Sequence, residues 1–411
     1  MVLDDLKGFP RNFRVLIASA LIENMAFGLI IPFLAIYIVE DLALDKWMAG
    51  VVLAGYTVAG VPSMIIGGML ADKIGRRPVL LSSLGLMSIT ILMYFFAYDF
   101  VTLLILVLAD SFVGSMYMPA ANAMIADVIK TPDRPRAYSA LRVAWNIGIL
   151  FGPVAGAIIV AAYPIKVLFV FGSLILAVAF VMNLVFIRES RPDKLESARI
   201  TFRTVMGVSR NRAFLLLCSL SAIFWFFFAQ WISVLPVYAK AELGVDDVLW
   251  AISFTFSAAM IVSLQLWVTS KVMRFRRSVV LAAGQLVAAL GFGLLFFATD
   301  FYSLLACIGV ITMGEIIYMS VLGAVIADMS PELERGLYMG FSGLVQQMGS
   351  GLGFLFGMSL LGAMGNAPVI WVIFAGIGAA PIFLYATFSW MVGPSIDNPT
   401  PKQDGVVESA Q

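Results

Sequence analysis

Twelve long apolar runs constrain this chain more than any other feature of its sequence. A helix needs roughly 20 apolar residues to cross the hydrocarbon core of a bilayer, and each run is close to that length or longer. Several connecting segments are too short to hold a soluble domain. The sequence therefore predicts an all-α membrane protein with transmembrane helices at residues 13–39, 47–70, 79–97, 100–126, 137–161, 167–187, 214–238, 248–270, 278–298, 302–327, 337–361 and 368–391.

The composition excludes several classes of function. Hydrophobic residues make up 61% and charged residues 12% of the chain, against roughly 45–50% and about 25% in soluble domains. The 26 Lys and Arg nearly balance the 25 Asp and Glu, so no basic excess is present to bind nucleic acid. The chain has no histidine, so proton chemistry must depend on carboxylates. Cys218 and Cys307 lie far apart in apolar runs, which predicts packing roles and no metal site, cofactor or disulfide.

The basic residues of the connecting segments fall mostly on one side of the predicted membrane. The positive-inside rule then places both termini and the central loop in the cytoplasm, in a plasma or inner membrane. The opening residues 1–10 are charged and lead into a full-length run, which is not typical of a cleaved signal peptide. The other side carries only Lys46, Lys166 and Lys240.

The two halves of the chain repeat each other at an offset of 200 or 201 residues. Tyr37 recurs as Tyr238, and Asp127 recurs as Asp328, both 201 residues later. Such parallel repeats occur in transporters that rock two bundles about a midplane site. We therefore expect a six-helix bundle at residues 1–187, an amphipathic cytoplasmic linker at 188–213, a second bundle at 214–391 and a disordered cytoplasmic tail at 392–411.

Four short segments carry a family resemblance. Residues 68–78 read GMLADKIGRRP and resemble the signature loop of the major facilitator superfamily. Residues 148–156 read GILFGPVAG and resemble the motif of its proton-antiporter branches. Residues 28–33 (GLIIPF) are similar to a stretch of multidrug efflux members, and 188–192 (RESRP) to the end of the first half. The resemblance spans the whole chain and implies the major facilitator fold of two six-helix bundles.

The resemblance also implies a cytoplasmic gate. In the family, the signature acid caps a helix of the opposite half, which here places Asp72 near Gly336 at the start of the eleventh run. A loop arginine pairs with the acid that closes the fourth run, which here joins Arg76 to Asp127. An anion at a helix N-terminus is favoured by about 0.3–1 kcal/mol, which suits a contact that must open. The predicted gate comprises Gly68, Asp72, Gly75, Arg76, Arg77 and Asp127.

The second copy of this loop is only partly conserved. It keeps Arg276 and Arg277 but has Val272 and Phe275 at the expected register of Asp72 and Gly75. We therefore expect an asymmetric gate.

The antiporter-like motif has a direct physical interpretation. Glycines at a spacing of four let helix backbones approach closely, and proline removes a backbone donor. We expect the fifth helix to be bent and tightly packed, either as ordinary helix packing or to shape an outward route. The residues concerned are Gly148, Gly152, Pro153 and Gly156.

Four ionisable residues lie inside the predicted helices. A charge at the bilayer centre costs at least about 2.5–3.5 kcal/mol on insertion scales, so such residues are candidates for function. Counting about 1.5 Å per residue places the three acids near mid-depth and the arginine nearer the cytoplasm. A low dielectric disfavours ionised carboxylates, so these acids could carry protons without histidine. They are Glu23, Asp110, Arg142 and Glu315, in the first, fourth, fifth and tenth runs.

Our leading hypothesis gives Glu315 and Asp110 the coupling role, each alternating between a proton and a cationic substrate. The alternative is that each acid is neutral, hydrogen-bonded and structural. Glu23 is the weakest candidate, because its neighbour Asn24 could satisfy it.

One position departs from the antiporter pattern. Gly114 stands where the fourth run of that branch usually has an arginine. Arg142 could supply the missing positive charge from the next helix.

Aromatic residues of the first, fourth, fifth, seventh and tenth runs are candidates for the substrate cavity. With the interior acids they would form an apolar, acidic chamber that favours lipophilic cations through burial and cation–π contact. Lipid-facing packing is the competing explanation for each ring taken singly. The set is Phe27, Tyr117, Trp145, Trp225, Phe228, Trp231 and Tyr318.

These features favour a proton-coupled exporter of lipophilic cations, of the drug/proton antiporter type. The alternative is a symporter or uniporter for one metabolite. A membrane enzyme is not supported, and the chain has no nucleotide-binding loop of the type that ATP-driven pumps use. The expected partners are a small-molecule substrate, protons and the lipid bilayer, and we expect a monomer.

Overall fold

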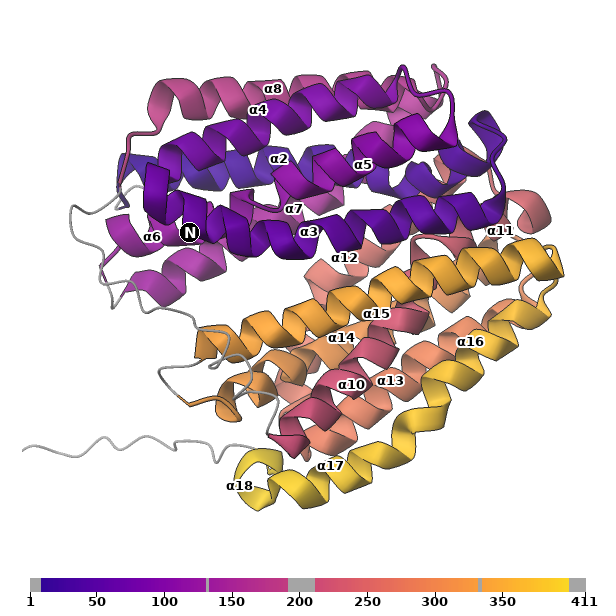
Figure 1. The fold of residues 1–411 in the computed structure, drawn as a ribbon. Coiled ribbons are helices and arrows are strands. Elements are labelled where there is room, and N and C mark those ends of the chain that lie inside the picture. Colours follow the sequence, from indigo (N-terminus) through magenta and orange to yellow (C-terminus); the bar gives the residue numbers. More distant parts are fainter. Residues whose placement is uncertain (1–8, 131–132, 191–210, 332–334, 399–411) are drawn as a thin grey trace, which may run out of the picture.

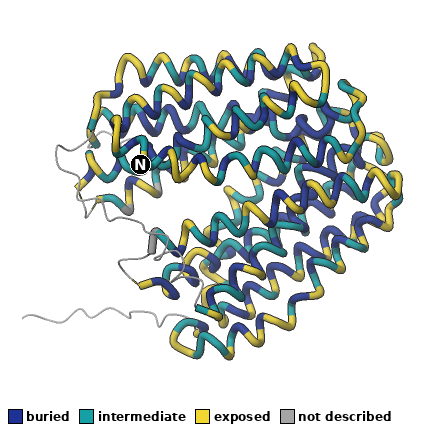
Figure 2. Tube along the Cα trace, viewed as in Figure 1, coloured by how far each residue is buried: buried dark blue, intermediate teal, exposed yellow. Residues whose placement is uncertain are grey.

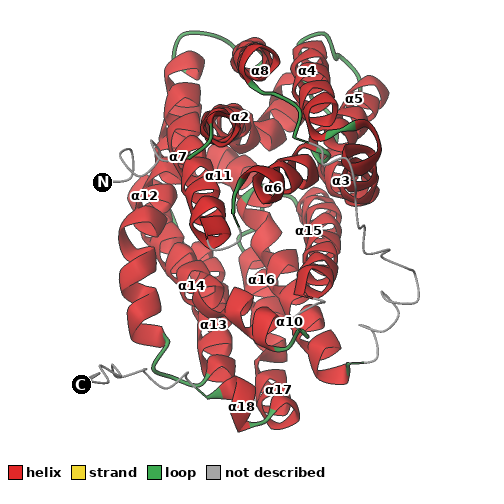
Figure 3. Ribbon diagram, turned by 90° about the vertical axis from the view of Figure 1, so that its left-hand side faces the viewer, coloured by secondary structure: helices red, strands yellow, loops and turns green. Residues whose placement is uncertain are grey.

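The computed structural model describes residues 9–130, 133–190, 211–331 and 335–398. In these ranges it contains 12 helical segments long and apolar enough to cross a membrane, as the sequence predicted. Figures 1 and 3 show helices and loops. The membrane-spanning segments of the first half are grouped together, and those of the second half lie beside them. The protein is therefore an all-α integral membrane protein.

The first half follows the predicted runs to within a few residues. Its fourth span is divided by a turn, whereas its fifth continues as one helix through Pro153. The elements are α2 (Arg11–Ile36) with a terminal π-helix η1 (Tyr37–Asp41), α3 (Lys46–Ile74), α4 (Arg76–Tyr94), α5 (Phe100–Gly114), α6 (Tyr117–Val128), α7 (Arg134–Val160) and α8 (Val167–Phe186).

The second half repeats this order. Its first and last spans are interrupted by 3-10 turns. The elements are α10 (Arg212–Phe228), η3 (Ala229–Trp231), α11 (Val234–Leu243), α12 (Asp247–Val272), α13 (Arg277–Leu294), η4 (Leu295–Phe297), α14 (Phe301–Asp328), α15 (Arg335–Met364), α16 (Val369–Ala379), η6 (Ala380–Phe383), α17 (Leu384–Val392) and α18 (Pro394–Asp397).

Most of the predicted linker, residues 191–210, and the tail residues 399–411 lie outside the described part of the chain. The expected amphipathic linker helix and the expected disorder of those tail residues remain predictions. The start of the predicted tail is folded, because Pro394–Asp397 form α18.

We call the side of the bundle that carries the starts of α2, α4, α7, α10, α13 and α15 the basic end. The other side is the opposite end. Matching caps at the opposite end show the repeat directly. Asp99 accepts the N–H of Thr102 at the start of α5, and Asp300 accepts the N–H of Ser303 at the start of α14. Hydrogen bonds from the Thr102 side chain and backbone hold the pKa of Asp99 below its ordinary value.

The outer surface is apolar, as a membrane-spanning protein requires. Figure 2 shows exposed residues along the outward sides of the helices. They include large side chains such as Leu266 (83% exposed) and Trp390 (84% exposed). Monomeric soluble proteins rarely expose broad apolar patches, so lipid is the natural solvent of these faces.

Close backbone packing joins α7 to α2 through the glycines of the antiporter-like motif. A Cβ at Gly148 would meet the backbone of Leu21, and one at Gly152 would lie 2.6–2.7 Å from backbone atoms of Gly28. A Cβ at Gly156 would lie 2.8 Å from the ring of Phe33. Only glycine permits this approach.

The same device recurs in the second half, 201 residues later. Gly349 and Gly353 of α15 lie against the backbones of Ala222 and Phe226 on α10, and Gly357 lies against the Gln230 side chain. Pro153 has Phe354 as its counterpart. The glycine triad is thus a packing device of both halves, and only the proline is peculiar to the first.

Replacing Gly152 with alanine is expected to destabilise the protein, because overpacking costs about 1–3 kcal/mol. Gly343→Ala is the matched control, since a Cβ there meets nothing within 4 Å, and alanine favours helix by about 1 kcal/mol. Thermal unfolding can be followed with a thiol-reactive fluorophore, because Cys218 and Cys307 are buried in the folded protein. Equal melting temperatures for the two variants would contradict the close α2–α7 packing.

Candidate functional site

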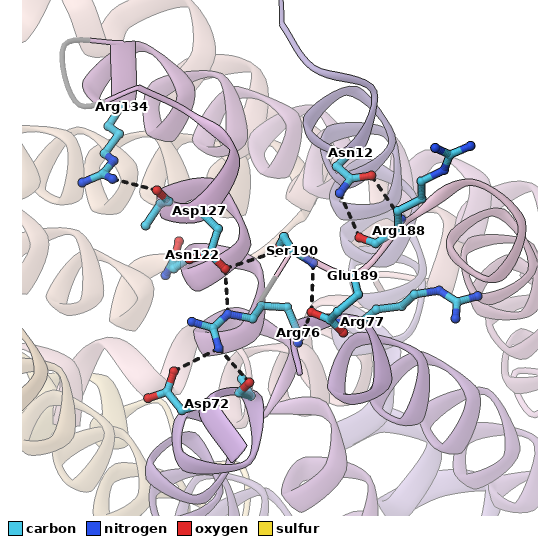
Figure 4. A network of polar contacts seen from close by, with 12 residues as sticks. Asn12, Asp72, Arg76, Arg77, Asn122, Asp127, Arg134, Arg188, Glu189 and Ser190 are labelled. Carbon is cyan, nitrogen blue, oxygen red and sulfur yellow. Dashed lines mark hydrogen bonds and ion pairs between the residues drawn. The ribbon is translucent and has the colours of Figure 1, made fainter. Parts of the chain in front are cut away.

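Arg76 is the centre of a polar network at the basic end of the first half (Figure 4). Its side chain is only 4% exposed, and its Nε lies 2.8 Å from Asp127 Oδ2. Its Nη1 lies 3.2 Å from Asp72 Oδ1 and donates to the Ala71 carbonyl at 2.8 Å. Arg76 therefore contacts Asp127, as the family resemblance implied. Removing one partner of so buried a charge would be costly.

Glu189, just beyond α8, holds the first turn of α4. Its Oε1 accepts the N–H of Arg76 at 2.9 Å, and its Oε2 accepts the N–H of Arg77 at 3.1 Å. These are two of the amides that a helix N-terminus leaves without partners. Gly75 has φ +109°, and a Cβ there would collide with the Glu189 carboxylate. Both the backbone conformation and the close approach therefore require glycine.

Ser190 completes the network by donating from Oγ to Asp127 Oδ2 at 3.1 Å. The sequence identified the RESRP segment by its resemblance but did not assign these contacts to Glu189 and Ser190. Glu189 is more than 100 residues from the α4 amides that it satisfies, so no local pattern could have assigned these contacts.

Two members of the predicted gate have looser surroundings. Asp72, near the end of α3, is 47% exposed, and its ion-pair partner is Arg76 at the start of α4. Residues 332–334, before α15, lie outside the described part, so the predicted contact of Asp72 near Gly336 remains a prediction. A Cβ at Gly68 would lie 3.8 Å from Pro119, an ordinary contact, so close approach does not demand glycine there.

The second half carries a matching arrangement at its basic end. Arg277 Nη1 lies 2.5 Å from Asp328 Oδ2, as Arg76 lies against Asp127. Arg76 therefore matches Arg277, 201 residues later, and the offset of 200 that placed Val272 and Phe275 opposite Asp72 and Gly75 is wrong by one residue. Asp397 accepts the N–H of Ser278 at 2.8 Å, so it holds the start of α13 as Glu189 holds α4.

Asp110 is a hydrogen-bonded acid between α4 and α5. Its carboxylate accepts from Thr90 Oγ1 at 2.9 Å and Tyr94 Oη at 3.3 Å, and it is 5% exposed. Arg142 makes no ion pair with Asp110 among the described residues, and its side chain is exposed on α7. Asp110 is therefore hydrogen-bonded, and the structure does not give it the positive partner that the sequence suggested.

Glu23 lacks the partner that the sequence suggested. Its Oε2 is buried and has no hydrogen-bond partner. The amide of Asn24 donates to the Ala20 carbonyl at 2.9 Å instead. Tyr56 and Tyr117 lie within electrostatic reach of the Glu23 carboxylate.

Glu315 is half-buried in the middle of α14, and no hydrogen bond or ion pair joins it to the described residues. The helix face on one side of it carries Tyr318, which stacks on Phe224 of α10 at 4.0 Å. The face on its other side carries Thr312, which bonds to Ser257 of α12 at 2.8 Å. Glu315 therefore points between α10 and α12, into its own bundle.

The structure divides the aromatic candidates into two groups. Tyr117 and Tyr318 are fully buried and bond to Ser19 and Ser221 within their own halves. Phe228 and Trp231 are each 6% exposed and stack on other rings. These four rings are packed against neighbouring side chains in this conformation. Phe27, Trp145 and Trp225 are more exposed, and the buried indole N–H groups of Trp145 and Trp225 have no hydrogen-bond partner.

At the opposite end, polar contacts join the two halves. Lys240 Nζ lies 2.8 Å from Glu40 Oε2 of the first half and 2.7 Å from Asp247 Oδ1 of its own half. Two further contacts cross between the halves, from Trp250 Nε1 to the Pro32 carbonyl at 2.8 Å and from Lys46 Nζ to Asn366 at 2.5 Å. Two of the three lysines on this side therefore hold the halves together.

A cavity of about 490 Å³ lies at this junction, between residues 39–47 and α15.

No cluster of metal-ligating side chains is present among the described residues. The junction depends on ion pairs and hydrogen bonds, which can separate without unfolding either half.

Lys240→Gln is expected to loosen the opposite end, because a partly exposed ion pair contributes about 0.2–1 kcal/mol. A cysteine placed at Ser359, which lines the cavity, should then react with an impermeant maleimide about 1.4- to fivefold faster. The background carries Cys218→Ser and Cys307→Ser. Lys166→Gln, at the same end, is the control and should leave the rate unchanged. Equal rates in both variants would contradict a closing role for Lys240.

Comparisons with known proteins agree with this architecture. A sequence model of the Major Facilitator Superfamily matches residues 16–275 and 250–410. A solved POT family transporter, in complex with a thioalcohol-conjugated peptide, superimposes with a TM-score of 0.79 at 15% identity, over 93% of this chain and 97% of that one.

Two curated relatives match most of this chain. The multidrug resistance protein MdtH of Cronobacter sakazakii is 25% identical over 82% of this chain and 84% of its own. A Na(+), Li(+), K(+)/H(+) antiporter of Planococcus maritimus is 23% identical over 84% of this chain and 88% of its own. The repeated bundles, the signature loop and the family match together show that this chain is a transporter of the Major Facilitator Superfamily and not an enzyme.

Proposed function

We propose that this protein is a proton-coupled secondary active exporter of lipophilic cations that works by alternating access. The observation that carries the proposal is a pair of acids inside the membrane, one in each half. Glu23 in α2 has a buried Oε2 without a hydrogen-bond partner. Glu315 in α14 is half-buried, and no hydrogen bond or ion pair joins it to the described residues. An acid buried in a low dielectric must bind a proton or a cation to remain there at low cost. Two such acids suit the exchange of a proton for a cationic substrate.

The contacts of the three acids suggest different roles. Glu315 remains our first candidate for coupling. Glu23 takes the place of Asp110 as its partner, because Thr90 and Tyr94 already occupy the Asp110 carboxylate. Asp110 then holds α4 against α5, and Phe27, Trp145 and Trp225 remain the aromatic candidates for the cavity.

The positions of the charged residues support one orientation of the protein in the membrane and one conformational state of the transport cycle. The positive-inside rule favours a cytoplasmic basic end in the cell membrane. Closure of the opposite end by Lys240 and Lys46 supports a form that is shut to the outside. In the alternate form, these contacts would separate while the predicted gate around Arg76 and Asp127 closes on the second half. We propose that one chain, acting as a monomer, completes the cycle.

The names of two relatives are consistent with this proposal, one as a multidrug resistance protein and one as a proton antiporter for metal cations. A metabolite symporter or uniporter is the second candidate. Arg142 and Asn146 are one turn apart and both exposed on α7, which would suit an anionic group, and the POT family structure was solved with a peptide.

Glu315→Gln is expected to abolish transport driven by a pH gradient, because the amide cannot release a proton. The purified protein is reconstituted in liposomes, a pH gradient is imposed, and the movement of a fluorescent lipophilic cation is recorded. Asp110→Asn is the matched control, since the amide oxygen can accept from one of Thr90 and Tyr94 while the amide NH2 donates to the hydroxyl oxygen of the other, and it should keep most of the gradient-driven rate.

Three results would contradict the proposal. Unchanged transport by Glu315→Gln would remove Glu315 from the coupling step. Wild-type transport that persists after the gradient is collapsed would reject proton coupling. No transport of the cation at all would favour the metabolite candidate.

A further inference from the structure

A groove on the membrane surface runs between α4 and α8. It has a volume of about 590 Å³. Its rim carries exposed apolar side chains, among them Leu86 (46% exposed) and Ile89 (56% exposed). The groove therefore opens toward lipid and lies outside the proposed transport pathway. It is lined by Leu81, Ser82, Gly85, Leu86, Ser88, Ile89, Ala177 and Phe180.

The length of the groove matches one leaflet. From Leu81 to Ile89 the helix rises about 12 Å at 1.5 Å per residue. One leaflet supplies about half of a hydrocarbon core that is roughly 30 Å thick. The groove therefore has the dimension of a single lipid acyl chain lying along the protein.

Arginine side chains lie beyond the end of the groove that is nearer the basic end. Arg77 is one turn before Leu81 on α4, and its Nη2 donates at 2.8 Å to the carbonyl of Leu184, one turn beyond Phe180 on α8. The Nε of Arg77 is buried and has no hydrogen-bond partner. A donor in this condition needs an acceptor, since an unpaired buried polar group is costly.

A second arginine, Arg188, lies at the same mouth. Asn12 fixes the backbone of Arg188 by accepting its N–H at 3.1 Å and donating to its carbonyl at 2.8 Å. Figure 4 shows the guanidinium groups of Arg77 and Arg188 directed to the same side, away from Asp127. The Glu189 carboxylate beside them already accepts two backbone N–H groups of α4.

We propose that the α4–α8 groove is a binding site for an anionic glycerophospholipid of the leaflet at the basic end. One acyl chain lies in the groove, and the phosphate lies against Arg77 and Arg188. The charge at the mouth favours lipid over a second copy of this chain, because an isologous contact would bring like-charged arginines together.

Native mass spectrometry of the purified full-length protein tests the site. The detergent-solubilised protein is titrated with phosphatidylglycerol and with phosphatidylcholine of identical acyl chains. Phosphatidylglycerol should bind more tightly. Arg188→Gln should weaken its binding about fivefold, which corresponds to about 1 kcal/mol, the typical contribution of one arginine beside anionic lipid. Arg274→Gln is the matched control, an exposed arginine at the basic end of the other half, and should change nothing.

A second variant tests the groove independently of charge. Ser82 is exposed and lines the groove, so Ser82→Phe should fill it and reduce the binding of both lipids. Thiol labelling of the buried Cys218 and Cys307 checks that each variant is folded. Equal affinity for the two lipids, an equal loss in Arg274→Gln, or effective competition by the headgroup without chains would overturn the proposal. A dimer mass that disappears in Ser82→Phe would assign the groove to a second copy.

Discussion

Backbone contact between neighbouring helices is the interaction on which this fold depends. Apolar side chains have little reason to leave lipid for each other, so helices in a membrane associate by close packing and by polar contacts. Glycines spaced by four residues allow that packing between α2 and α7, and again between α10 and α15. Each half thereby obtains a rigid pair of helices, against which its other helices are placed.

The duplication of this packing changes what the antiporter-like motif can mean. Gly148, Gly152 and Gly156 have counterparts in Gly349, Gly353 and Gly357, which perform the same packing. The glycines alone are therefore explained without any reference to proton exchange. What remains particular to the first half is Pro153, around which α7 nevertheless stays continuous.

The sequence was sufficient for the fold because the bilayer sets both the length and the polarity of each span. All 12 spans were predicted to within a few residues. The candidate site was less predictable, because a list of ionisable residues does not say which of them find partners. Asp110 ranked above Glu23 on the sequence, yet it is Asp110 that Thr90 and Tyr94 satisfy. Those partners lie on α4, and the helical periodicity of α5 does not predict which residues of another helix will face Asp110.

The same limit explains why Glu189 and Asp397 were not recognised. Each follows the sixth helix of its half and holds the start of the third, through the N–H groups of Arg76 and Arg77 or of Ser278. In each bundle, a carboxylate that follows the sixth helix thus binds the start of the third helix of the same bundle. A chain divided within residues 191–210 would leave both carboxylates with their helices, so the two halves made as separate polypeptides should each fold and then find one another in the membrane.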